Sequence, residues 1–156
     1  RAFSDFSKVH GDWVLEIYGD GSLRDDLICL ADDLGVGEKV SINPGRHDVH
    51  EIVRDAGMFV LPSDYEGLSN SMLEAMAIGL PCICTDCPCG GARMVIRDGE
   101  NGLLVPVGDD RELLYAMTRI ADEDGLANRL CTSAELLREK LSVSVIADEW
   151  CREIGE

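Results

Sequence analysis

The sequence predicts an α/β fold, a Rossmann-like doubly wound parallel sheet with helices on both faces. Short apolar runs alternate with longer segments of helical periodicity along the chain, which is the pattern of parallel strands joined by crossover helices. The 156 residues are one domain's length and can bury a sizeable core. Hydrophobic residues make up 46% and charged residues 28% of the chain, so an ordinary folded domain is expected.

The first part of the chain predicts a helix, a strand, a second helix and a second strand. Apolar residues within 1–10 are spaced like one face of a short helix. Residues 13–18 follow as a strand, and Ser22 is the expected N-cap of a helix that Gly35 ends. A short strand with β-branched residues is expected at 39–42.

The rest of the chain predicts three strands and six helices. The strands are expected at 58–61, 81–85 and 103–107. The helices are expected as a short one ending near Ala56, one over 69–78, one opened by Gly90-Gly91, and three over about 109–122, 125–139 and 143–154. Asp48 is the expected N-cap of the first of these helices, and Asp109 or Asp110 that of the fourth.

The chain carries a large negative charge. It has 30 acidic and 14 basic residues, a formal net charge of −16. Nucleic acids and anionic membrane surfaces select for clusters of Lys and Arg, so this balance argues against both as partners. A small anionic ligand is compatible with it, because a helix N-terminus with one or two Arg makes a local site and distant charges are screened within about 10 Å.

No run of 18 or more apolar residues is present, and no basic, hydrophobic leader precedes a small-residue cleavage site. These features favour a soluble, cytoplasmic domain without membrane insertion.

Four of the seven cysteines lie between Cys82 and Cys89, and two interpretations are open. The Cys84-x-x-Cys87 spacing is that of a metal-binding knuckle, although structural zinc sites usually pair two knuckles and no second one is present. The other interpretation is a buried strand in which Cys82 and Cys84 share one face as small hydrophobes. Reduced thiols of this kind suit a cytosolic compartment.

A candidate anion site follows the apolar run at 58–62. Glu66 and Gly67 read as a tight loop, and a helix beginning near Ser69 would present free backbone N–H groups and the positive end of its dipole. Gly67 lets a ligand approach the backbone closely. Asn70 and Glu74 stand four residues apart and fall on one polar stripe. Alternatively, Glu74 is simply the solvated edge of a mostly buried helix.

The loops at 19–21, 43–47, 62–69 and 86–91 all follow expected strands. In a doubly wound sheet, ligands bind at the carboxyl ends of the strands, so these loops are expected to share one edge. Arg46 lies in the second loop and is one of few basic residues beside a strand end; on its own it is equally well a solvated loop residue.

Six segments carry a more specific pattern. They are IYGDGSLR at 17–24, PGRHDV at 44–49, DAGMFVLPS at 55–63, EGLSNSMLE at 66–74, EAMAIGLP at 74–81 and DGENGLLVP at 98–106. In this order, and over nearly the whole chain, they resemble the C-terminal, donor-binding domain of retaining glycosyltransferases of the GT-B fold. The two Glu eight residues apart, Glu66 and Glu74, resemble the signature of that family.

The resemblance implies roles for these residues. Glu74 would accept from the ribose hydroxyls, and a carboxylate is able to bind both hydroxyls of a diol. Glu66 would face the donor sugar as the catalytic residue, and Arg46 would lie near the nucleotide base. The full donor-binding set implied is Glu74, Gly67, Leu68, Ser69, Asn70, Arg46, Gly19 and Gly21.

The resemblance also implies the context. Residues 1–156 would be one nucleotide-sugar-binding domain, a fragment lacking the N-terminal acceptor domain and the first strand of its own domain. The full-length protein would transfer a sugar, with a UDP-hexose favoured as donor, to a saccharide or lipid-linked acceptor with retention, in the cytoplasm or at the inner membrane face. The fragment alone would be inactive, and neither a cofactor nor a divalent metal is expected. The alternative is a non-catalytic nucleotide- or metal-binding α/β module.

Overall fold

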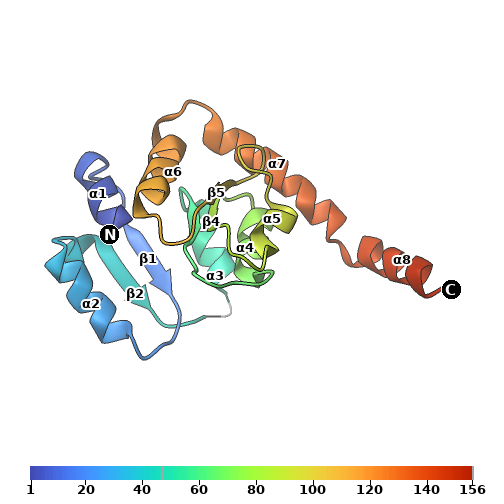
Figure 1. Cartoon of the computed structure of the whole chain (residues 1–156), viewed down its shortest axis with the longest axis horizontal. Coiled ribbons are helices and arrows are strands. Elements are labelled where there is room, and N and C mark those ends of the chain that lie inside the picture. The colour runs from blue at the N-terminus through green and yellow to red at the C-terminus, as the bar shows by residue number, and fades with distance from the viewer. Residues whose placement is uncertain (47, 156) are drawn as a thin grey trace.

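Strands and helices alternate as the sequence predicts (Figure 1). The computed structural model describes residues 1–46 and 48–155. Its strands are β1 (Leu15–Tyr18), β2 (Val40–Asn43), β3 (Phe59–Leu61), β4 (Cys82–Thr85) and β5 (Leu103–Val105). Its α-helices are α1 (Ala2–Val9), α2 (Arg24–Asp33), α3 (Val49–Ile52), α4 (Asn70–Ala77), α5 (Gly91–Val95), α6 (Asp110–Asp122), α7 (Leu126–Lys140) and α8 (Val143–Ile154).

The strands pair in parallel but form two sheets instead of the single sheet expected. One contains β1 and β2, and the other has the order β3-β4-β5. The starts of β1 and β3 lie together, because Trp13, just before β1, packs directly on Gly57, just before β3. Among the described residues, no strand lies between these two strands to join the sheets by hydrogen bonds. The fold is nevertheless the expected α/β class, with parallel strands and helices on both sides.

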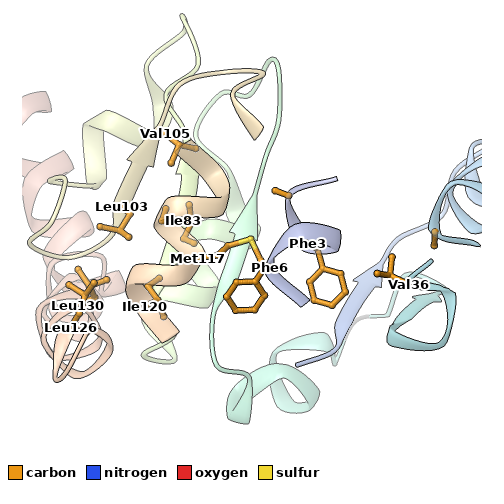
Figure 2. Close-up of a cluster of buried hydrophobic side chains, with 13 residues drawn as sticks. Phe3, Phe6, Val36, Ile83, Leu103, Val105, Met117, Ile120, Leu126 and Leu130 are labelled. Atoms are coloured by element: carbon orange, nitrogen blue, oxygen red, sulfur yellow. The ribbon is translucent and has the colours of Figure 1, made fainter. Parts of the chain in front are cut away.

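Side-chain packing, not backbone pairing, joins the two sheets. Phe6 of α1 is 1% exposed, and its ring lies 4.3 Å from that of His10 and 5.4 Å from that of Trp13. Figure 2 shows Phe6 beside Met117 of α6, in one cluster with Ile83 of β4. The helix α1 therefore connects the part of the core under β1 with the part around α6.

The strand β4 is buried along its whole length and separates two apolar clusters. Ile83 belongs to the cluster with α1, α6 and the start of α7, whereas Cys82 and Cys84 belong to the cluster with α4 and α5. This confirms that the two cysteines share one face of a buried strand. Helix α4 therefore packs its buried face against the side of β4 that carries the thiols.

Helix boundaries agree with the sequence except where a cap was misjudged. Asp109 is the N-cap of α6, and its Oδ1 accepts hydrogen bonds from the backbone N–H groups of Arg111 and Glu112, each at 3.0 Å. The prediction of Ser22 as N-cap of α2 is wrong, because that helix begins one residue later after Leu23, without a side-chain cap. Asp48 does occupy the N-cap position of α3, but its side chain makes no capping bond.

Candidate functional site

The N-terminus of α4 presents unused hydrogen-bond donors, as predicted. Ser69 is the N-cap, and its hydroxyl accepts from the backbone N–H of Met72 at 3.4 Å. Within the described residues, the N–H groups of residues 68–71 donate to no other part of the protein. These groups and the positive end of the helix dipole together favour an anion at this position.

Helix α4 buries one face and exposes a narrow polar edge. Met72 and Met76 are fully buried, whereas Asn70, Ser71 and Glu74 are exposed. Because this edge begins at the free N–H groups, an anion bound there would have Glu74 one helical turn away on the same helix.

Glu66 lies in the loop before α4 and is half-buried. Among the residues that the structure describes, the carboxylates of Glu66 and Glu74 form no hydrogen bond or ion pair. Both are therefore available to a ligand. An added Cβ at Gly67 would meet nothing within 4 Å, so the side of Gly67 on which a side chain would stand is open.

A second group of predicted residues gathers at the ends of β1 and β2. The N–H of Gly19 donates to the carbonyl of Asn43 at 3.1 Å, and the N–H of Gly45 donates to the Asp20 carboxylate at 3.2 Å. A side chain at Gly45 would collide with that carboxylate. Gly21 lies in the same turn and is exposed.

Arg46 already has a partner in this group. Its Nε and Nη2 donate to the two oxygens of Asp48 at 2.9 and 2.7 Å, and these bonds hold the pKa of that carboxyl below its usual value. This explains why Asp48 does not cap α3. His47, within the loop predicted at 43–47, lies outside the described residues.

No hydrogen bond or ion pair between described residues links the first group to the second. Each group lies at the carboxyl ends of parallel strands, and the opposite ends of β1 and β3 meet at Trp13 and Gly57, which is consistent with the one edge predicted. At this edge, a hollow of about 390 Å³ is lined by Asp86, Pro88 and residues 104–107. It contains neither Glu66 nor Glu74.

The cysteine-rich segment packs as a core strand. Among the described residues, no three His, Cys, Asp or Glu side chains gather as metal ligands. Burial raises the pKa of the Cys84 thiol from 9.0 to about 12 and raises that of Cys82 as well. Both shifts have the same main cause, the apolar surroundings of a buried strand, which disfavour the charged thiolate.

The raised pKa of Cys84 predicts a loss of stability in alkali. Between about pH 9 and pH 12 this thiol ionises in the unfolded chain but not in the folded one, so the free energy of unfolding falls as pH rises through that range. One such thiol contributes at most about 1.4 kcal/mol per pH unit. Urea unfolding in a reducing buffer at several pH values should show a shallower slope for Cys84→Ala. Cys29→Ala, which alters an exposed thiol, should keep the original slope; equal slopes in all three proteins would contradict the prediction.

Comparison with known proteins identifies the family. Residues 1–136 match the family described as glycosyl transferases group 1, and the chain belongs to it. The lipopolysaccharide core biosynthesis glycosyltransferase LpsE of Rhizobium meliloti is 35% identical over 139 residues, which are 88% of this chain and 39% of that protein. The UDP-Gal:alpha-D-GlcNAc-diphosphoundecaprenol alpha-1,3-galactosyltransferase of Escherichia coli is 31% identical over 113 residues, 72% of this chain and 29% of that protein.

Solved structures agree on the fold. TarM of S. aureus, crystallised with UDP among its ligands, superposes with a TM-score of 0.87 and 24% identity over 97% of this chain and 31% of that one. The chain thus has the fold of a C-terminal-type GT-B domain, and it spans less than half the length of these relatives. None of the helices described is long and apolar enough to cross a membrane.

The sequence predicts that the loop at 86–91 lies at this edge, but it does not reveal what that loop contacts. The segment 85–91 contacts the loop that carries Glu66 through Thr85, Cys87, Cys89 and Gly91. In the sequence, the paired glycines at 90 and 91 indicate only the start of a helix. The structure shows that the second glycine also permits a close backbone approach, because an added Cβ at Gly91 would overlap the carbonyl of Gly67.

Proposed function

We propose that this domain binds a nucleotide-diphosphate sugar, with a UDP-hexose favoured, for retaining transfer to a saccharide or lipid-linked acceptor. The observation that carries the proposal is the arrangement of Glu66 and Glu74 on either side of the free N–H groups of α4. Family membership supports sugar transfer, and the E. coli relative's name specifies UDP-galactose and a diphosphoundecaprenol-linked substrate.

The parts of the donor match the groups available. The ribose diol is assigned to Glu74, which is exposed and unpaired among the described residues, and such a carboxylate accepts charge-assisted hydrogen bonds from two hydroxyls. The diphosphate is assigned to the N–H groups at residues 68–70, which are also one helical turn from Glu74. Arg46 is assigned to the base; it would exchange part of its pairing with Asp48 for the ligand.

Departure of the nucleoside diphosphate is the step that needs electrostatic help, because negative charge grows on its oxygens. Donors already oriented toward that charge lower the barrier without reorganisation, and the α4 N-terminus supplies such donors. Glu66 is assigned to the sugar, where its carboxylate holds hydroxyls and stabilises positive charge at the anomeric carbon. No metal ion or other cofactor is needed in this scheme.

Acceptor binding is assigned to a further domain of the same polypeptide. The relatives are more than twice as long as the segment that matches this chain, and Glu66 and Glu74 lie at an open edge of the domain, where a second domain can close over the sugar. Acceptors linked to a lipid would place the complete enzyme at the cytoplasmic face of the membrane.

The test is a calorimetric titration of the complete polypeptide with UDP, GDP and ADP. One nucleotide, with UDP favoured, is expected to bind with a dissociation constant between micromolar and millimolar. Added EDTA should leave that constant unchanged, because the proposed contacts are to protein groups alone. Equal and very weak binding of all three nucleotides would refute the donor site.

A further inference from the structure

The loop at 62–69, which carries Glu66, is hydrogen-bonded to the neighbouring segment 85–91. The Thr85 hydroxyl and the Cys87 thiol both donate to the carbonyl of Ser63, at 2.5 and 3.1 Å. Farther along, the Cys89 thiol donates to the carbonyl of Glu66 at 2.6 Å. Three side chains of the segment 85–91 therefore bind two backbone carbonyls of the loop at 62–69, those of Ser63 and Glu66.

Gly91 makes the closest of these contacts. It is buried, and a Cβ added there would overlap the carbonyl of Gly67 and lie 2.7 Å from the backbone nitrogen of Leu68. Helix α5 thus begins directly against the peptide between Gly67 and Leu68. Any side chain at this position must push that peptide away, since backbone atoms cannot rotate aside as a flexible side chain can.

The two contacts lie at either end of residues 66–68. This segment carries the Glu66 carboxylate at one end and the free N–H of Leu68 at the other. Cys89 holds the carbonyl of Glu66, whose side chain is unpaired among the described residues, and Gly91 sets the position of the peptide that leads to the free N–H of Leu68. Displacing this segment would move both the carboxylate and the first of the N–H donors. A displacement of about 1 Å is enough to disturb a site of this kind.

We propose that Cys89 and Gly91 are positioning residues for the donor sugar and its diphosphate. The inference rests on the proposed function for its consequence in binding, whereas the positioning itself can be measured without a ligand. Cys89 acts through one hydrogen bond to the Glu66 carbonyl, and Gly91 acts by leaving room for the 67–68 peptide. Glu74 lies on the following helix, so the ribose contact should depend on them less.

Removing the Cys89 thiol should therefore weaken binding of the nucleotide sugar more than binding of the nucleotide alone. In the complete polypeptide, Cys89→Ala is expected to weaken binding of UDP-galactose roughly three- to tenfold, as for one lost hydrogen bond, and that of UDP less. Cys89→Ser, whose hydroxyl is also a donor, should restore most of the affinity. Cys29→Ala removes another exposed thiol and should change neither value.

Gly91→Ala should weaken the binding of both UDP-galactose and UDP at least tenfold. The added methyl group displaces the 67–68 peptide, whereas loss of the Cys89 thiol only releases one carbonyl. The control is Gly11→Ala, where an added Cβ would meet only the tip of the Lys39 side chain at 4.0 Å. If Gly91→Ala fails to fold, the comparison of alanine with serine at position 89 still decides the role of the thiol.

Hydrogen exchange of the backbone amides of Met72 and Leu73, which donate to the hydroxyl and the carbonyl of Ser69 at the end of this segment, supplies the readout that needs no ligand. Exchange should be faster in Cys89→Ala than in the unmodified protein and normal in Cys89→Ser. If the unmodified protein binds no nucleotide, the proposed function fails while the exchange result still decides the positioning. If it binds UDP-galactose and all the Cys89 and Gly91 variants match their controls in binding and exchange, the positioning role is wrong.

Discussion

Glu74→Ala is expected to weaken nucleoside diphosphate binding by about tenfold or more, near 1.4 kcal/mol, as for the loss of a charged hydrogen-bond acceptor. The side chain is exposed on α4 and forms no hydrogen bond or ion pair with a described residue, so its removal should leave the free energy of unfolding within about 0.5 kcal/mol of its original value. Titration with UDP alongside urea unfolding separates the two effects.

Two further variants make this result interpretable. Glu74→Gln keeps the size and one acceptor oxygen but removes the charge, so its affinity should fall between those of the original and alanine proteins. Glu149→Ala, an exposed carboxylate on α8, tests whether lowering the negative charge of the domain affects anion binding by itself. An affinity for UDP that is unchanged in Glu74→Ala would place the ribose elsewhere and would remove the basis for the neighbouring assignments.

Phe6→Ala is expected to lower the free energy of unfolding by about 3–5 kcal/mol, the range for truncation of a buried aromatic side chain. The ring is 1% exposed and contacts His10, Trp13 and the α6 side of the core. Because no strand pairing among the described residues joins the two sheets, this ring contributes both to the core and to the connection between them. Chemical denaturation followed by circular dichroism measures the loss.

The same helix offers a matched control in Val9, which is 79% exposed. Val9→Ala should change the free energy of unfolding by no more than about 0.5 kcal/mol. Amide exchange in β1 and β2 should rise in Phe6→Ala more than exchange in β4, since Trp13, just before β1, loses its contact with the Phe6 ring. Similar losses in the Phe6 and Val9 variants would show that α1 does not connect the sheets.

Local patterns were sufficient to predict the elements and the centre of the candidate site. The Ser69 cap before the run from Met72 to Met76 fixes where α4 begins and which side is buried, so the free N–H groups and the exposed Glu74 follow from the sequence. The alternation of Cys82, Ile83 and Cys84 likewise determines which face of β4 each side chain occupies, since successive side chains of a strand point to opposite faces.

Features that depend on a choice between competing partners, or on a contact between residues far apart in the sequence, could not be predicted in this way. Ser22 has the chemistry of an N-cap, yet α2 begins after Leu23 without a side-chain cap. Asp48 has the same chemistry, but the nearby guanidinium of Arg46 is a stronger partner than a helix N–H. Position 91 requires a glycine only because α5 begins directly against the peptide after Gly67. That contact joins residues far apart in the sequence, so no local pattern predicts it.

The separation of β1 from β3 has a consequence for how this domain meets other chains. Each of these strands has an edge without a partner strand among the described residues, and such edges recruit extended segments from other chains. We propose that a strand preceding Arg1 in the complete polypeptide fits between them, because the order β2-β1-gap-β3-β4-β5 then becomes that of a doubly wound nucleotide-binding sheet with its first strand in place. On its own, the domain thus presents two strand edges on which a peptide strand can pair, and we expect it to associate with its neighbours in concentrated solution.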